Sequence, residues 1–290
     1  MSIPLHKNSL LQNAFFSWHS LTHSPPNYLF LLSHMRSYST LLAHILGSSP
    51  EIDGYGETHV KYRNTFALTS LQRRVSRSIG HATEGRYLLD KILHNYVQSP
   101  DRLLDRSTVR TIIFIRKPES TLRSILINNA YASEKKQIKG VQAACDYYVS
   151  RLHRLRMEGE RLGKDALYFQ SESLISSPQA LLTALSNWLN LGTPLRTEYE
   201  VGSRTGEAGF GDPSPNIRQG KILGPEASTI KKDIVIPRIV LHEAEAAYER
   251  CNDALQRSCQ LLPYCKNVHQ MNMMHRQNYD AGMNVVEVAH

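Results

Sequence analysis

Two segments of the chain place an arginine and several hydroxyl groups directly after an apolar run. In the first, the run at 28–32 leads to Arg36, and in the second the run at 111–115 leads to Arg116. An apolar run, a polar turn and an amphipathic stretch together indicate a buried strand that leads into a helix. A helix N-terminus binds phosphate through its unpaired N–H groups and partial positive charge. Two such turns on one sheet predict a ligand with two separate phosphate groups.

The first turn combines one fixed positive charge with several hydroxyl groups. Arg36 supplies the charge and forked N–H donors. The sequence has no G-x-x-x-x-G-K-[ST] motif, which disfavours a P-loop kinase that uses ATP and magnesium but leaves it as the alternative enzyme class. An ordinary turn capped by serine or threonine is the other interpretation. Besides Arg36, the residues expected to contact the ligand are Ser37, Tyr38, Ser39, Thr40 and Leu41.

The second turn reads Arg116-Lys117-Pro118 and is followed by Ser124, eight residues after the arginine. An arginine at a strand end and a serine on the next helix can converge on one phosphate. Either residue alone would be an ordinary surface side chain. The spacing, together with the first turn, favours a second phosphate site.

Together these motifs resemble those of the sulfotransferase superfamily, which uses 3′-phosphoadenosine-5′-phosphosulfate (PAPS). The segment 36–42 is similar to the 5′-phosphosulfate loop, with Tyr38 where the family usually has glycine, and the second turn matches the 3′-phosphate signature. The resemblance covers about 27–225 and is nearest to the Arg/Glu/Lys type of tyrosylprotein and bacterial sulfotransferases. It implies PAPS as cofactor, release of adenosine 3′,5′-bisphosphate and no metal.

The resemblance also implies catalytic residues. Glu57, which follows the first helix, is expected to be the base that takes the acceptor's proton, with His59 as the rival base. Lys91 is expected to stabilise the transition state together with Arg36, and Asp90 to hold Lys91 in place. The implied reaction is in-line transfer of the sulfuryl group to an acceptor hydroxyl or, as a weaker option, an amine. A nucleotide-binding protein without catalysis is the non-enzyme alternative.

A long loop is expected at 202–226, which is rich in Gly, Pro, Ser and Asn. Its segment 209–222 falls where the family has a loop that covers the cofactor. Arg218 and Lys221 in this loop are therefore expected to contact the 3′-phosphate or the adenine. An exposed basic loop is the equal alternative for this segment.

Composition narrows the possible partners. The 290 residues carry a formal net charge of +8, with a pI near 9.3, and 41% of them are hydrophobic. This favours a globular protein with an anionic ligand, and the absence of an unbroken basic tract disfavours nucleic acid.

The four cysteines show no zinc-ligand spacing and fit a reducing compartment. No segment predicts a membrane span or signal peptide, so a cytoplasmic location is expected. The acceptor stays open between a small molecule, a carbohydrate, a lipid and a peptide, and no oligomeric state is indicated.

Alternating strand and helix patterns predict an α/β fold of the P-loop-like type, with a central parallel sheet between two helical layers. We expect a leader at 1–26, one sulfotransferase domain at 27–265 and a polar tail at 266–290. The predicted strands are 27–33, 52–55, 87–89, 111–115 and 166–169. The predicted helices include 63–80, 144–162, 178–189 and 237–262.

Overall fold

The computed structural model describes residues 26–64, 66–84, 86–97, 104, 107–128, 138–206, 215–224 and 234–263. Within these residues, six strands form one parallel sheet in the order β2-β3-β1-β4-β5-β6. Residues 1–25 of the predicted leader and the whole predicted tail lie outside the described residues. The strands are β1 Asn27–Leu32, β2 Ile52–Asp53, β3 Tyr87–Ile92, β4 Val109–Ile115, β5 Ala166–Gln170 and β6 Gln260–Leu261.

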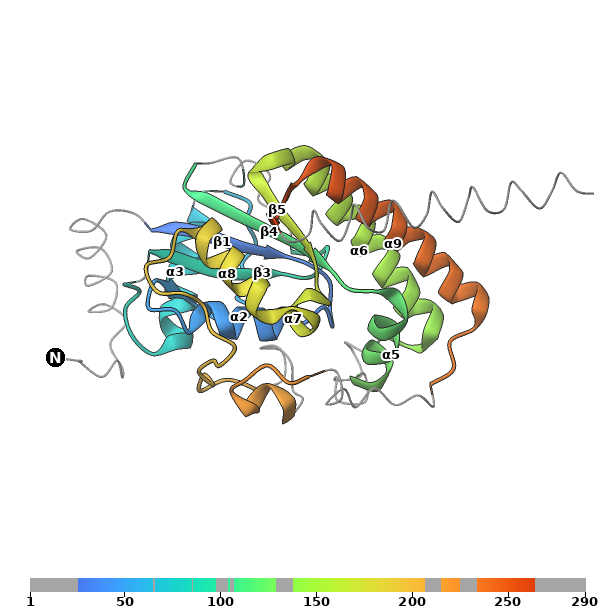
Figure 1. Cartoon of the computed structure of the whole chain (residues 1–290), viewed down its shortest axis with the longest axis horizontal. Helices are drawn as coiled ribbons and strands as arrows, with labels where there is room; N and C mark the ends of the chain where they lie inside the picture. The colour runs from blue at the N-terminus through green and yellow to red at the C-terminus, as the bar shows by residue number, and fades with distance from the viewer. Residues whose placement is uncertain are drawn as a thin grey trace, which may run out of the picture.

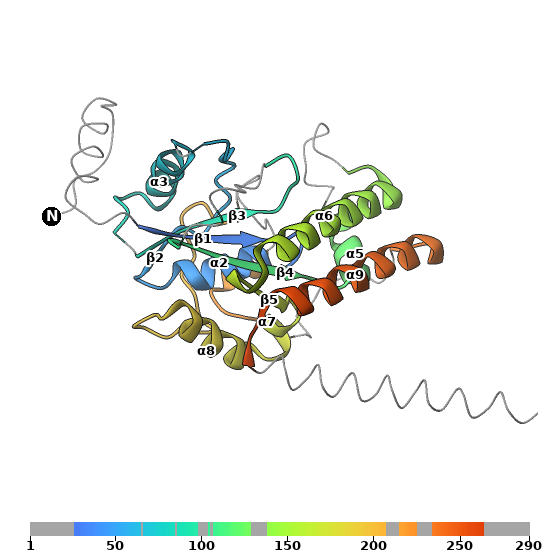
Figure 2. The same ribbon diagram turned by 90° about the horizontal axis from the view of Figure 1, so that it is seen from above.

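Helices cover both faces of this sheet (Figures 1 and 2). On one face lie α2 Ser39–Gly47, α7 Ser173–Ser176 and α8 Pro178–Leu189. On the other lie α3 Phe66–Ile79, α5 Pro118–Asn128, α6 Gly140–Leu162 and α9 Arg238–Ser258. The predicted three-layer α/β fold is therefore confirmed.

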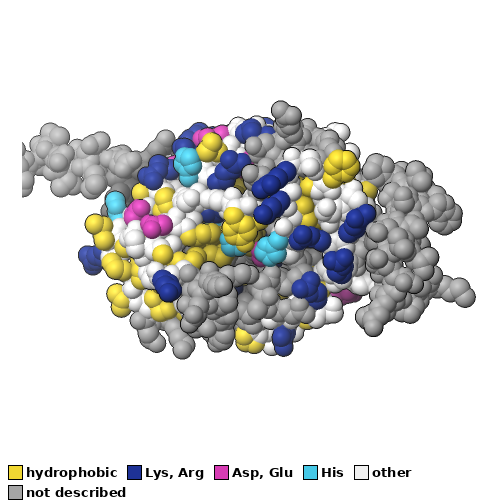
Figure 3. All heavy atoms as spheres, turned by 180° about the vertical axis from the view of Figure 1, so that it is seen from behind, with side chains coloured by type: hydrophobic (Ala, Val, Ile, Leu, Met, Phe, Trp, Pro, Cys, Tyr) yellow, Lys and Arg dark blue, Asp and Glu magenta, His cyan; other side chains and the backbone are white. Residues whose placement is uncertain are grey.

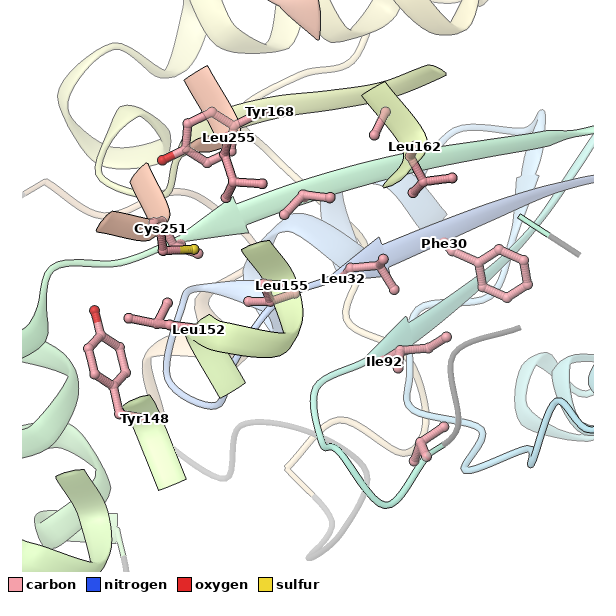
Figure 4. Packing of buried hydrophobic residues seen from close by; sticks show 14 of the residues in the cluster. Phe30, Leu32, Ile92, Tyr148, Leu152, Leu155, Leu162, Tyr168, Cys251 and Leu255 are labelled. Atoms are coloured by element: carbon pink, nitrogen blue, oxygen red, sulfur yellow. The ribbon is translucent and has the colours of Figure 1, made fainter. Parts of the chain in front are cut away.

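The two apolar layers explain why the central strands are continuous hydrophobic runs. Side chains alternate along a strand, so Leu29 and Leu31 of β1 face α2 and α8, whereas Phe30 and Leu32 face α6 and α9. Figure 4 shows the second layer, where Leu155 of α6 lies close to Leu32 above the sheet. Both sides of β1 are buried, which fixes its register and the direction in which the following turn leaves the sheet.

The two long helices approach each other closely at Gly159 of α6. A Cβ atom there would lie 2.1 Å from Leu255 Cδ2 of α9 and 3.2 Å from Cys259 Sγ. Any larger residue at 159 would require the Leu255 side chain to move. Cys145, Cys251 and Cys259 are buried and form no disulfide, whereas Cys265 lies outside the described residues.

One predicted helix ends earlier than expected. Residues 237–262 were predicted to be helical, but α9 ends at Ser258, and Cys259 has extended backbone angles. Gln260 and Leu261 then pair with β5 as the edge strand β6. The apolar pattern continues through the turn, so hydrophobic periodicity alone does not separate the last helical turn from this short strand.

The strand order determines where the functional turns lie. β1 lies between β3 and β4, and Leu32 at its end pairs with Ile92 and Ile113. The chain passes from β1 to β2 and β3 on one side of β1, and then crosses to β4 on its other side. α/β proteins bind ligands at such a switch in strand order, beside the carboxyl ends of the strands. No helix among the described residues is long and apolar enough to cross a bilayer. Lys and Arg side chains recur over the face in Figure 3, where Asp and Glu are sparse.

Candidate active site

The turn after β1 has an unusual backbone. Arg36 has φ 63° and Tyr38 has φ 64°, both in the left-handed region that residues with a side chain rarely adopt. Hydroxyl contacts hold the turn in this shape, because Ser37 Oγ lies 2.7 Å from Ser33 Oγ and donates to the His34 carbonyl at 2.7 Å. Tyr38 is the N-cap of α2 and makes no capping hydrogen bond with its side chain. The first turn of α2 also contains no acidic residue, which leaves the positive end of the helix dipole without a carboxylate from that turn.

His34 connects this turn to the second one. Its Nε2 accepts a hydrogen bond from the Arg116 backbone N–H at 2.9 Å, and its Nδ1 lies 2.8 Å from the Met35 carbonyl. This pattern assigns the proton to Nδ1 and leaves Nε2 as the acceptor. Burial lowers the pKa of His34 to about 3, so the imidazole is neutral near pH 7. A neutral ring is what the Arg116 contact requires.

The two arginine turns also meet through their side chains. Arg36 Nε donates to Ser124 Oγ at 2.8 Å, and Arg116 Nη1 donates to the Arg36 carbonyl at 2.9 Å. Arg116 is buried, and its pKa is lowered by burial first and by the charge of Arg36 to a smaller degree. The sequence analysis placed Arg36 only at the first turn. The structure brings its guanidinium to Ser124 of the second, because left-handed backbone at Arg36 turns the side chain toward α5.

A second polar cluster lies at the end of β3. Lys91 Nζ, whose side chain is fully buried, lies 3.2 Å from Thr40 Oγ1 and 3.7 Å from Glu57 Oε1. Glu57 Oε2 lies 4.0 Å from His94 Nε2. The structure thus brings the predicted base and the predicted lysine together beside the first turn of α2.

One expectation about this cluster is wrong. Asp90 does not hold the Lys91 ammonium, since neighbouring strand residues point to opposite faces of the sheet. Its buried carboxylate instead accepts hydrogen bonds from the Thr58 backbone and hydroxyl and from the Tyr62 hydroxyl, and burial raises its pKa. His59 is exposed at φ 53°, and the histidine that lies within 4.0 Å of Glu57 is His94. A role for His59 as the rival base stays a prediction.

The sequence analysis did not identify His94. The available signal was its position three residues after Lys91, just beyond the end of the same strand. Its ring stacks on Tyr96, with ring centroids 4.9 Å apart, and lies 5.9 Å from the Tyr147 ring. These contacts fix the plane of the imidazole next to Glu57.

Side chains of helix α6 hold the segments that follow β1, β3 and β4. The Tyr147 hydroxyl contacts backbone groups after β1 and after β3, at 2.8 and 2.9 Å, and the Tyr148 hydroxyl donates to the Arg116 carbonyl at 2.6 Å. Arg151 is fully buried and donates to the Ser33 carbonyl at 2.8 Å and to the Ile92 carbonyl at 2.5 Å. Burial lowers the pKa of Arg151 to about 10, so it remains a cation near pH 7.

The predicted cofactor-covering loop is described in part. Arg218 lies in the short 3-10 helix Pro215–Gln219, with its guanidinium next to Gly206. The backbone of Lys221 pairs with that of Glu198 in an isolated antiparallel β-bridge. Both basic side chains are exposed. The segment is tied to α2, because Thr205 Oγ1 lies 2.7 Å from His44 Nε2. Contact of Arg218 or Lys221 with a phosphate stays a prediction.

Comparison with known proteins identifies the fold. Neither a family model nor any curated protein matches the sequence significantly. The solved "Sulfotransferase Domain from the Curacin Biosynthetic Pathway" matches with a TM-score of 0.52 and 17% identity, over 80% of this chain and 99% of that one. The sulfotransferase domain of the Synechococcus PCC 7002 olefin synthase matches with a TM-score of 0.49 and 19% identity, over 79% and 96%. The chain therefore has the fold of a sulfotransferase domain.

Proposed function

We propose that this protein is a sulfotransferase that moves the sulfuryl group from PAPS to an acceptor hydroxyl or amine. The observation that carries the proposal is the junction of the two turns, where Arg36 contacts Ser124 and Arg116 contacts the Arg36 carbonyl. This junction joins two anion-binding elements at the switch point of the sheet. The fold shared with the curacin domain supports the same reading.

The donor set suits a ligand with two phosphate groups. Arg36 and Arg116 are close enough for the charge of one to lower the pKa of the other, and a bound phosphate would offset this repulsion while accepting forked hydrogen bonds. The N-terminus of α2, whose first turn contains no acidic residue, and the buried Lys91 ammonium form a second positive region. Among the described residues, no group of three or more His, Cys, Asp or Glu side chains could hold a metal ion.

Bound PAPS would supply the sulfuryl group and a bisphosphate leaving group. Lys91 and the first N–H groups of α2 would donate to the negative charge that develops during transfer. Preorganised donors of this kind contribute roughly 3 kcal/mol each in known enzymes. Glu57 would take the proton from the acceptor. Its two oxygens face Lys91 and His94, which fixes the carboxylate in one orientation.

Turnover tests the proposal without knowledge of the acceptor. The full chain would be incubated with PAPS and separate pools of phenols, sugars, lipids, peptides and amines, and adenosine 3′,5′-bisphosphate would be measured by chromatography. We expect release above the buffer rate with at least one pool, and its loss in Lys91→Ala. Release no faster than in buffer with every pool would contradict the proposed activity.

A further inference from the structure

We propose that Tyr38 is a positioning residue for Arg116 and thereby gives the site its preference for ligands that carry a 3′-phosphate. The inference rests on the proposed function and adds a role that the first turn alone does not imply. Tyr38 belongs by sequence to the first turn. In the structure its ring instead contacts the arginine of the second turn.

The contact is a cation–π interaction of close geometry. Arg116 Cζ lies 4.1 Å from the centroid of the Tyr38 ring, well inside the range in which a guanidinium is attracted to an aromatic face. The guanidinium donors point outward in its own plane. A ring over the face therefore leaves the donating edge available, and one of these donors already reaches the Arg36 carbonyl.

The backbone gives independent support. Tyr38 has φ 64° and ψ 17°, a conformation that suits glycine or asparagine and costs energy for a tyrosine. The turn would adopt this conformation more easily with a smaller residue. A ring that contacts Arg116 compensates for the backbone strain and accounts for an aromatic side chain at this position.

A competing acceptor lies close to Arg116. Glu172 Oε1 accepts the Lys117 backbone N–H at 2.8 Å, while Glu172 Oε2 is buried and accepts no hydrogen bond from the described residues. This carboxylate attracts the Arg116 charge. Without the ring, the Arg116 side chain is free to turn toward Glu172. The Tyr38 ring keeps it directed at the Arg36 carbonyl, beside the place where the 3′-phosphate is expected.

Two variants separate the ring from the backbone. Tyr38→Asn keeps a residue that tolerates left-handed backbone but removes the ring, and Tyr38→Phe keeps the ring without the hydroxyl. Calorimetric titration would compare adenosine 3′,5′-bisphosphate with adenosine 5′-monophosphate, which lacks the 3′-phosphate. For Tyr38→Asn we expect the Kd of the bisphosphate to rise about 5- to 30-fold and that of the monophosphate to change less than about twofold. Tyr38→Phe should recover most of the affinity.

Arg116→Ala provides the second arm of the test. In that background, Tyr38→Asn should add almost no further loss, because the ring acts through the arginine. An undiminished affinity of Tyr38→Asn, an equal loss for both nucleotides, or full additivity with Arg116→Ala would overturn the inference. Tyr38→Gly repeats the measurement if the asparagine variant fails to fold. A wild-type protein that does not bind the bisphosphate would instead refute the proposed function itself.

Discussion

Glu57 is the residue on which the proposed chemistry depends most directly. Its carboxylate lies 3.7 Å from Lys91 Nζ and 4.0 Å from His94 Nε2, beside the α2 first turn that is expected to receive the phosphosulfate. Glu57→Gln keeps the size of the side chain but cannot take a proton. We expect turnover with PAPS to fall roughly 100- to 10,000-fold, while the Kd for adenosine 3′,5′-bisphosphate changes little. Steady-state kinetics and calorimetry measure the two effects.

Glu160→Gln is the matched control, because Glu160 is an exposed glutamate on α6. It should leave turnover unchanged. If Glu57→Gln retained near-normal turnover and His94→Asn abolished it, His94 would replace Glu57 as the base.

His34 gives the protein a predictable dependence of stability on pH. Its pKa falls from 6.5 to about 3 on folding. Between these values the unfolded chain holds a proton that the native state does not, so stability rises with pH across this range. For each unit by which the pH falls below 6.5, His34 alone should lower the free energy of unfolding by about 1.4 kcal/mol. Urea denaturation between pH 7 and pH 4 measures this slope.

His34→Gln supplies the comparison. Glutamine retains an acceptor for the Arg116 N–H but does not titrate, so the slope should flatten even though the variant is less stable at pH 7. An unchanged slope would show that His34 is not the group that takes up the proton.

At the scale of elements, α6 fixes the ends of the three central strands. Arg151 joins the carbonyls of Ser33 and Ile92 from a fully buried position. Arg151→Met removes these bonds and leaves two buried carbonyls with fewer partners, so we expect a loss of about 3–5 kcal/mol in the free energy of unfolding. Chemical denaturation checks this value.

Arg154→Met on the same helix removes a cation whose side chain is 37% exposed and pairs with Glu158. Glu158 is buried but keeps Arg161 as a partner, with Nη2 3.1 Å from Oε2, so we expect a smaller loss than for Arg151→Met. Equal losses in the two variants would contradict the anchoring role of Arg151.

The sequence predicts those elements whose apolar runs are long and buried on both sides. β1 and β4 lie within one or two residues of their predicted positions, as does α8. β6 could not be predicted, since two residues beyond a helix become a strand only through pairing with β5. In the candidate site, too, contacts that depend on the folded structure could not be predicted from the sequence. Arg36 and Ser124 each stand out in the sequence, but their contact depends on left-handed backbone that no local pattern requires.

At the scale of the whole molecule, the strand order makes one site from distant segments. β3 and β4 flank β1, so residues near 36, 57, 91 and 116 meet at one edge of the sheet. The excess of basic residues, +8 overall, adds a favourable field for an anionic ligand. The chain shares this framework with a solved sulfotransferase domain, at a TM-score of 0.52.

The most direct measurement is calorimetric titration of the wild type and Arg116→Ala with adenosine 3′,5′-bisphosphate, beside ATP with magnesium. We predict that the wild type binds the bisphosphate in preference to ATP with magnesium. Loss of the Arg116 charge-assisted hydrogen bonds should weaken bisphosphate binding by about tenfold or more. No binding of the bisphosphate, or a clear preference for ATP with magnesium, would contradict the account and favour a kinase.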